Sequence, residues 1–291
     1  MVQKSTFEAE IKSYKHKQNA AVKLIKIVSD LWFNHTIELI FFRNQLVDRR
    51  VSKILNLHEE SKALSETPIS IFATLQVAEK IQNLKLAPSR IDIGKLALKI
   101  REQDIDDDQL LYFIKKELIS AKEHKSFEPR DVVLYGFGRI GRLLARELIT
   151  KAGAGHQLRL RAIVTRDQID PKTLKKRAML LQNDSIHGEF EGTVDIDAQK
   201  GALIINGATV YIISAKEPEA IDYTKYNINN ALVIDNTGAF RDDKELSRHL
   251  LSNGASQVLL TAPGKGVSNI VYGVNTEMID TDNHTIFSAA S

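Results

Sequence analysis

Apolar side chains recur every three or four residues along the first part of the chain, a spacing that gathers them on one side of a helix. Two such runs contain Phe7, Ile11, Tyr14, Leu24, Ile27, Val28 and Leu31, and then Ile37, Ile40, Phe41, Val47, Val51, Ile54 and Leu55. Residues 126–130 include Pro129, and a proline and the residue before it both disfavour helix. The pattern predicts an all-helical region over residues 1–125 and a linker over residues 126–130.

Helix-capping residues divide this region further. Thr67 precedes Pro68, the order expected at a helix start, and predicts a helix to about residue 84. Ser89 is the expected cap of the next helix, to about residue 100. Asp106 is followed by two more aspartates, which the helix dipole favours in a first turn, and predicts a helix to Ala121.

After the linker, short apolar runs alternate with helical patterns, which predicts a doubly wound parallel sheet, the Rossmann arrangement. Asn206-Gly207 is typical of a tight hairpin, because both turn positions favour positive φ. It predicts a small antiparallel insertion within this second region, residues 131–291. The expected strands are residues 131–135, 158–164, 193–197, 203–206, 209–214, 231–235, 257–261, 271–274 and 285–289.

Composition narrows the class of protein. Hydrophobic residues make up 43 % and charged residues 26 %, as in an ordinary soluble protein. We find no apolar run long enough for a membrane helix and no secretory signal, so we expect a cytoplasmic protein without membrane contact. The chain has no cysteine, which excludes disulfides, thiolate metal sites and a cysteine nucleophile within these 291 residues.

Charge is uneven along the chain. Residues 1–125 contain 21 Lys and Arg against 17 Asp and Glu, a surplus of +4, whereas the whole chain has a net charge of +3. One interpretation of the basic cluster of Arg43, Arg49, Arg50 and Lys53 is a binding site for RNA or another anionic partner. Because the bases are interleaved with acids, we favour a solvated helical face and do not expect nucleic acid binding.

The candidate chemistry begins at Gly136-Phe137-Gly138-Arg139-Ile140-Gly141, a G-x-G-x-x-G turn between an expected strand and an expected helix. Gly136 permits the tight turn, Gly138 lets the backbone approach a pyrophosphate, and Gly141 lets the helix and strand pack closely. Unpaired backbone N–H groups at the helix start would bind that pyrophosphate. We therefore predict a nicotinamide dinucleotide site; the alternative is a purely structural glycine turn.

The end of the next expected strand leaves the choice between NAD and NADP open. Val164 is followed by Thr165, Arg166 and Asp167. An arginine here suits the 2′-phosphate of NADP, whereas an acidic residue suits the free ribose hydroxyls of NAD. Arg166 is thus a candidate 2′-phosphate ligand, and Asp167 a candidate ribose ligand.

Five segments of the second region carry a family resemblance, residues 135–142, 183–188, 236–240, 261–266 and 272–275. They are similar to the motifs N-G-F-G-R-I-G-R, Y-D-S-T-H-G, S-T-G-V-F, A-P-x-K-G and G-V-N of one family. Residues 132–291 therefore resemble the phosphorylating glyceraldehyde-3-phosphate dehydrogenases. The first 125 residues resemble the helical N-terminal extension of a longer bacterial subgroup.

The resemblance implies roles for particular residues. The amides of Arg139 and Ile140 would contact the pyrophosphate, and Thr165 falls where most members carry the ribose-binding aspartate. It also implies an oxidoreductase that converts a phosphorylated aldehyde and phosphate to an acyl phosphate, in carbohydrate metabolism, and a homotetramer. The residues implied to line the adenine and nicotinamide side are Thr237, Gly238, Phe240 and Thr261.

The family's catalytic cysteine would follow Ser291. The expectation is therefore an incomplete sequence, without the catalytic domain and inactive by itself, with a natural non-catalytic form as the alternative. A second hypothesis remains open: a dinucleotide-binding or interaction module that uses the basic helical extension. We find no metal-ligand spacing among the histidines and carboxylates.

Overall fold

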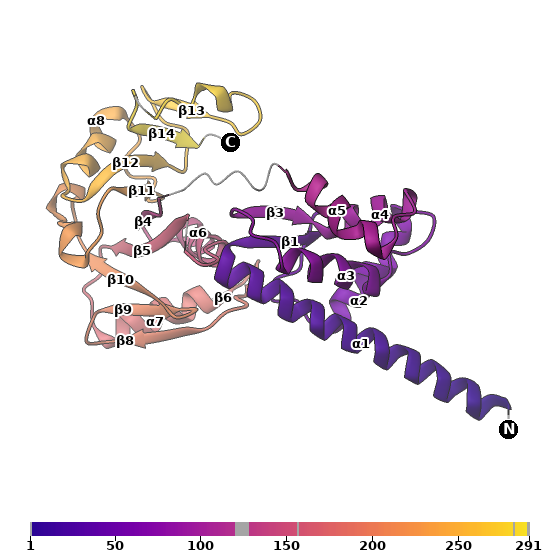
Figure 1. The fold of residues 1–291 in the computed structure, drawn as a ribbon. Coiled ribbons are helices and arrows are strands. Elements are labelled where there is room, and N and C mark those ends of the chain that lie inside the picture. Colours follow the sequence, from indigo (N-terminus) through magenta and orange to yellow (C-terminus); the bar gives the residue numbers. More distant parts are fainter. Residues whose placement is uncertain (1, 120–127, 156, 282, 290–291) are drawn as a thin grey trace. The chain divides into compact units, whose positions relative to one another are not determined.

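The computed structural model describes residues 2–119, 128–155, 157–281 and 283–289 (Figure 1). Two compact units make up the chain, Met1–Ser126 and Phe127–Ser291. The predicted helix end at Ala121, the first two residues of the predicted linker and the terminal Ser291 lie outside the described residues. None of the helices in the described ranges is long and apolar enough to cross a membrane.

The first unit combines helices with a small sheet around one apolar core. The core gathers Leu24 and Val28 of the first helix with Ile54, Ile81 and Ile114 of later helices. The helices are α1 (Val2–His35), α2 (Val51–Glu60), α3 (Ile71–Gln82), α4 (Ile93–Glu102) and α5 (Asp107–Glu117), with a 3-10 turn at Ser61–Ala63. The strands are β1 (Ile37–Phe41), β2 (Asn44–Gln45) and β3 (Ser89–Asp92), in the order β2-β1-β3.

The prediction of an all-helical first region was therefore incomplete. Thr36 adopts a φ of 54°, which ends α1 and starts an extended segment. β1 then pairs antiparallel with β2 and parallel with β3, a strand about fifty residues away in the sequence. Phe42 and Arg43, both at positive φ, form the tight turn between β1 and β2. Helical periodicity hid β1 because nearly all of this short strand is buried, so polar and apolar residues do not alternate.

Two predicted helix starts shift to a nearby polar residue. α3 is capped by Ser70, whose hydroxyl accepts from the Phe72 N–H at 3.2 Å, and Thr67 lies ahead of it. α4 is capped by Asp92, because Ser89 belongs to β3. The predicted cap of α5 is confirmed: the Asp106 carboxylate accepts from the Gln109 N–H at 2.9 Å.

The second unit is a largely parallel sheet with the order β13-β14-β12-β11-β4-β5-β10-β9-β8, which confirms the predicted Rossmann-like fold class. Apolar clusters lie on both faces of this sheet. The parallel strands are β4 (Arg130–Tyr135), β5 (Leu158–Thr165), β10 (Ala208–Ser214), β11 (Ala231–Asp235), β12 (Ala255–Leu260), β13 (Ser268–Ile270) and β14 (Ile286–Ala289). The helices are α6 (Arg139–Thr150), α7 (Pro171–Gln182) and α8 (Asp243–Leu246), with 3-10 turns at Pro218–Ala220, Tyr223–Tyr226, Ser247–Leu251 and Thr276–Met278.

The antiparallel insertion is confirmed as β8 (Val194–Asp197) and β9 (Ala202–Ile205), which extend the sheet beside β10. Asn206 and Gly207 form its hairpin turn with φ values of 46° and 81°. The predicted strand over residues 271–274 is wrong, because this segment is a turn closed by the Val274 N–H on the Val271 carbonyl. A two-stranded sheet, β6 (Asn183–Asp184) with β7 (Gly188–Glu189), follows α7.

The order of the strands locates a ligand crevice. From β4 the chain runs outward through β5 and β10, and it then returns to the other side of β4 as β11. In open α/β sheets, ligands bind outside the carboxyl ends of the strands where the order reverses in this way. Here that position is shared by the residues that follow Tyr135 of β4 and Asp235 of β11.

Candidate dinucleotide site

The glycine turn connects β4 to α6 at this reversal. Gly136 has a φ of 105°, a conformation that favours glycine, and its N–H donates to the Val164 carbonyl of β5 at 3.0 Å. Gly138 is the N-cap of α6 and provides no side-chain cap to the helix. The first N–H groups of α6, including those of Arg139 and Ile140, therefore face away from the helix without an intrahelical acceptor.

Two glycines of this turn have different surroundings. A Cβ at Gly141 would lie 2.5 Å from the Asn236 Oδ1 atom and 2.5 Å from the Gly136 carbonyl oxygen, so the helix start sits directly against the β11 loop. At Gly138, chain neighbours aside, no described atom comes within 4 Å of such a Cβ. The space beside Gly138 is thus open, as close approach of a pyrophosphate requires.

A cavity of about 400 Å³ opens above the turn. Its lining includes the candidate ribose ligand Asp167 and five other residues that the sequence analysis proposed, Gly136, Gly138, Thr165, Arg166 and Thr237. The proposed residues that do not line it are Arg139, Ile140, Gly141, Gly238, Phe240 and Thr261. Lining residues that were not proposed are Tyr135, Phe137, Arg142, Val164, Arg177, Ala215 and Ala239.

Three arginines, Arg142, Arg166 and Arg177, face this cavity together with one carboxylate, Asp167. Arg177 forms an ion pair with Asp167, and its guanidinium lies 6.0 Å from the centre of the Phe137 ring. Arg166 is exposed. The cavity therefore has a surplus of positive charge, which suits an anionic ligand such as a dinucleotide.

Thr165 and Arg177 differ in how well the sequence revealed them. Thr165 is buried at the end of β5, and its hydroxyl has no hydrogen-bond partner among the described residues. Arg177 lies in α7, ten residues after Asp167, and nothing in its local sequence marks a binding residue. Only the packing of α7 beside the glycine turn brings its guanidinium to the cavity.

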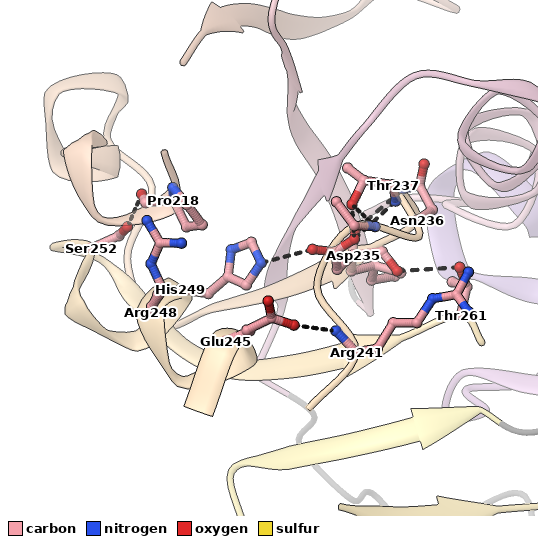
Figure 2. A network of polar contacts seen from close by, with 12 residues as sticks. Pro218, Asp235, Asn236, Thr237, Arg241, Glu245, Arg248, His249, Ser252 and Thr261 are labelled. Atoms are coloured by element: carbon pink, nitrogen blue, oxygen red, sulfur yellow. Dashed lines mark hydrogen bonds and ion pairs between the residues drawn. The ribbon is translucent and has the colours of Figure 1, made fainter. Parts of the chain in front are cut away.

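The β11 side of the site is held in place by a buried carboxylate, Asp235 (Figure 2). Its Oδ1 atom accepts from the N–H and the hydroxyl of Thr237, each at 2.8 Å. The Nε2 atom of His249 donates to its Oδ2 atom at 2.9 Å. The side chains of Asp235 and His249 are both fully buried. This network holds the loop that begins at Asn236 and presents Thr237 to the cavity.

Aromatic rings enclose His249. Tyr135 lies edge-on to it with ring centres 4.6 Å apart, and Phe240 lies 5.8 Å away. Burial raises the pKa of Tyr135 to about 12, and the nearby Asp235 carboxylate adds to this effect. The Tyr135 hydroxyl therefore stays neutral at physiological pH. In this structure Phe240 belongs to the core beneath the loop.

The remaining proposed residues frame the β11 loop. Gly238 has a φ of 71°, and its carbonyl accepts from the Arg241 side chain at 3.0 Å. Thr261, after β12, donates its N–H to the Asp235 carbonyl at 3.0 Å, which joins the two strand ends (Figure 2). These contacts fix the shape of the loop without placing either residue in the cavity lining.

The segment after α7 also approaches the site. The guanidinium of Arg142 lies 3.8 Å from the carboxylate of Asp184. Hydrogen bonds from His187 and from the Ile186 N–H lower the pKa of Asp184 below its usual range. His187 therefore helps to hold the turn between β6 and β7 in place. No group of three metal-binding side chains occurs in the parts of the chain that the structure describes.

Comparison with known proteins agrees with this geometry. Residues 130–243 match the model of the glyceraldehyde 3-phosphate dehydrogenase family's NAD binding domain. The chain resembles the glyceraldehyde-3-phosphate dehydrogenases. The match supports NAD(P) as the cofactor class, and the cationic cavity, the open space at Gly138 and the uncapped α6 fit such a ligand.

Individual relatives show how far the likeness extends. A glyceraldehyde-3-phosphate dehydrogenase-like protein of Pseudomonas aeruginosa (strain UCBPP-PA14) is 40 % identical over 278 residues, which cover 92 % of this chain and 59 % of that protein. Glyceraldehyde-3-phosphate dehydrogenase 2 of Bacillus subtilis (strain 168) is 35 % identical over 161 residues, 55 % of this chain and 43 % of that protein. The chain thus spans about two fifths to three fifths of these relatives' lengths. The first match covers too much of the chain to be confined to the second unit.

Proposed function

We propose that this chain supplies the dinucleotide-binding part of an oxidoreductase of the glyceraldehyde-3-phosphate dehydrogenase type. In the whole protein an aldehyde, inorganic phosphate and NAD(P)⁺ would give an acyl phosphate, NAD(P)H and a proton. The observation that carries this proposal is the glycine turn at the strand reversal, which has the family's motif and opens into a cationic cavity. A phosphorylated aldehyde as substrate and a homo-oligomeric whole protein belong to the same proposal.

Each side of the cavity has a separate part in binding. The N–H groups of Arg139 and Ile140 would hold the pyrophosphate, because α6 has no side-chain cap to compete for them. Thr237, fixed by Asp235, would position the ring of the cofactor that lies over the β11 loop. The nicotinamide supplies the hydride acceptor when it is bound.

The absence of cysteine makes a clear prediction for the chain as it stands. The family's chemistry forms a thiohemiacetal on a cysteine, so the 291-residue chain should bind cofactor without oxidising aldehyde. Calorimetry should detect saturable binding of a dinucleotide, while absorbance should show no NAD(P)H formed from glyceraldehyde 3-phosphate and phosphate. A chain that binds neither dinucleotide would contradict the proposed function, and aldehyde-dependent reduction would contradict the prediction of inactivity.

We further propose that NADP binds at least as tightly as NAD. Arg166 is exposed at the cavity, whereas Asp167, the residue suited to free ribose hydroxyls, is engaged by Arg177. A charge-assisted contact to the 2′-phosphate contributes about 1.5–3 kcal/mol, so Arg166→Ala should weaken NADP binding by about tenfold or more and leave NAD binding nearly unchanged.

Calorimetric titration with both cofactors tests this preference. Lys176→Ala is the matched control, because it removes an exposed cation from α7 that does not line the cavity. This control should change neither affinity. A tenfold preference for NAD that persists in Arg166→Ala would show that Arg166 does not select the cofactor.

A further inference from the structure

The N-terminal part of α1 lies outside the apolar core of the first unit, which begins along this helix at Ala20. Every residue from Thr6 to Asn19 is exposed, whereas Ala20, Ala21 and Leu24 begin the buried part of the same helix. Figure 1 shows this part of α1 as a continuous extension of the helix beyond the rest of its unit. Since its C-terminal half is anchored in a folded core, the exposed half is already ordered and would lose little conformational freedom on binding.

Its apolar residues form one stripe. Phe7, Ile11 and Tyr14 are 64 %, 39 % and 48 % exposed and are spaced by four and then three residues. Gln18 continues the spacing into the next turn. This is the 3.5-residue repeat of a coiled-coil seam, in which such positions meet a second helix.

The charged residues beside the stripe are ordered. Glu8 and Lys15 follow the stripe on one side, and Glu10 and Lys17 follow it on the other. On both sides the acid comes first and the base comes one heptad later. Lys17 contacts Glu59 at 3.2 Å, but both side chains remain largely exposed, so Lys17 stays accessible at the surface.

We propose that residues 6–19 of α1 form an antiparallel helix pair with the same segment of a second copy of this chain. Antiparallel pairing places the two acids of each helix beside the two bases of the other, on both sides of the seam. A parallel pair sets acids level with acids and satisfies fewer of these charges. The segment is therefore complementary to itself, which identifies the partner as a second copy.

Sedimentation of the full chain over a range of concentrations tests the pairing. Two charge-reversed variants are needed: Glu8→Lys with Glu10→Lys, and Lys15→Glu with Lys17→Glu. Each variant alone should associate at least tenfold more weakly than the unchanged chain, because like charges then face each other across the seam. An equimolar mixture of the two should recover association, since each helix then complements the other.

Controls separate this interface from others. Lys12→Glu changes an exposed charge away from the stripe and should leave association unchanged. Far-UV circular dichroism should show equal helix content in all variants. If the chain stays monomeric at the highest concentration, the proposal is wrong and the stripe binds a different partner. If both reversed variants still associate, the proposal is wrong and the copies associate through a different surface.

Orientation has its own measurement, because the chain contains no cysteine. Phe7→Cys and Gln18→Cys lie at opposite ends of the segment, so mild oxidation should join the two variants to each other when they are mixed. Phe7→Cys by itself should form little disulfide dimer. Efficient dimerisation of Phe7→Cys alone indicates a parallel pair and overturns the antiparallel arrangement.

Discussion

Asp235 is the residue on which the β11 side of the site depends most. It is fully buried, and its carboxylate accepts hydrogen bonds from Thr237 and from His249. Removing one member of a buried charged network leaves its partners without acceptors. Asp235→Ala should therefore lower the free energy of unfolding by about 3 kcal/mol and weaken cofactor binding, because the Thr237 loop loses its anchor.

Chemical denaturation and calorimetry on the same preparations measure both effects. Glu245→Ala is the control, since this carboxylate accepts the Arg241 N–H in the same region but at an exposed position. Its cost should stay below about 1 kcal/mol, as is usual for exposed contacts. If Asp235→Ala and Glu245→Ala lower the free energy of unfolding equally, the burial of Asp235 does not add to its contribution to stability.

Single residues also show where sequence reasoning stops. Gly136, Gly138 and Thr237 could be proposed because they belong to motifs with a fixed spacing, and all three line the cavity. Arg177 and Asp235 have no such mark, because each acquires its role from a contact made by tertiary folding. Arg177 of α7 pairs with Asp167 in the loop before that helix, and Asp235 of β11 pairs with His249 in the 3-10 turn Ser247–Leu251.

At the scale of elements, glycine has two different roles at the junction between β4 and α6: one glycine allows close packing and another leaves space for a ligand. A Cβ at Gly141 would overlap Asn236 and the Gly136 carbonyl, so Gly141→Ala should destabilise the cofactor-free fold by about 1–3 kcal/mol. Gly138→Ala adds its Cβ to open space, so its cost should stay below about 1 kcal/mol. The same Cβ would occupy the expected path of the pyrophosphate and should weaken cofactor binding by about tenfold or more.

Each glycine variant is thus the other's control. Denaturation without cofactor measures stability, and calorimetry measures affinity. If Gly138→Ala binds the dinucleotide as tightly as the unchanged chain does, the pyrophosphate does not approach the backbone at this turn.

The elements also differ in how readily they can be predicted from the sequence. The central strands β4, β5, β10, β11 and β12 of the second unit could be predicted because each contains a separate apolar run, and Asn206-Gly207 fixes the hairpin locally. β1 could not, because it is short, almost wholly buried, and pairs with β3, a strand about fifty residues away in the sequence. Its tight turn at Phe42 and Arg43 carries neither asparagine nor glycine at the positive-φ positions, so the usual hairpin signal is missing.

At the scale of the whole molecule, each compact unit has apolar clusters of its own, and the proposed cofactor site lies entirely in the second unit. The only tryptophan, Trp32, is buried in the first unit. Its fluorescence therefore reports unfolding of the first unit, whereas far-UV circular dichroism reports both units. These two signals allow the effect of the cofactor to be assigned to one unit.

A ligand at one hundred times its Kd adds about 2.7 kcal/mol to the unfolding free energy of the part that binds it. NADP⁺ at such a concentration should raise the denaturation midpoint of the second unit and leave the Trp32 midpoint unchanged. At the same NADP⁺ concentration Gly138→Ala, with its at least tenfold weaker binding, should keep at most about half of this stabilisation. If the Trp32 midpoint rises with the dichroism signal, the two units unfold as one, and the cofactor stabilises the N-terminal region through that coupling.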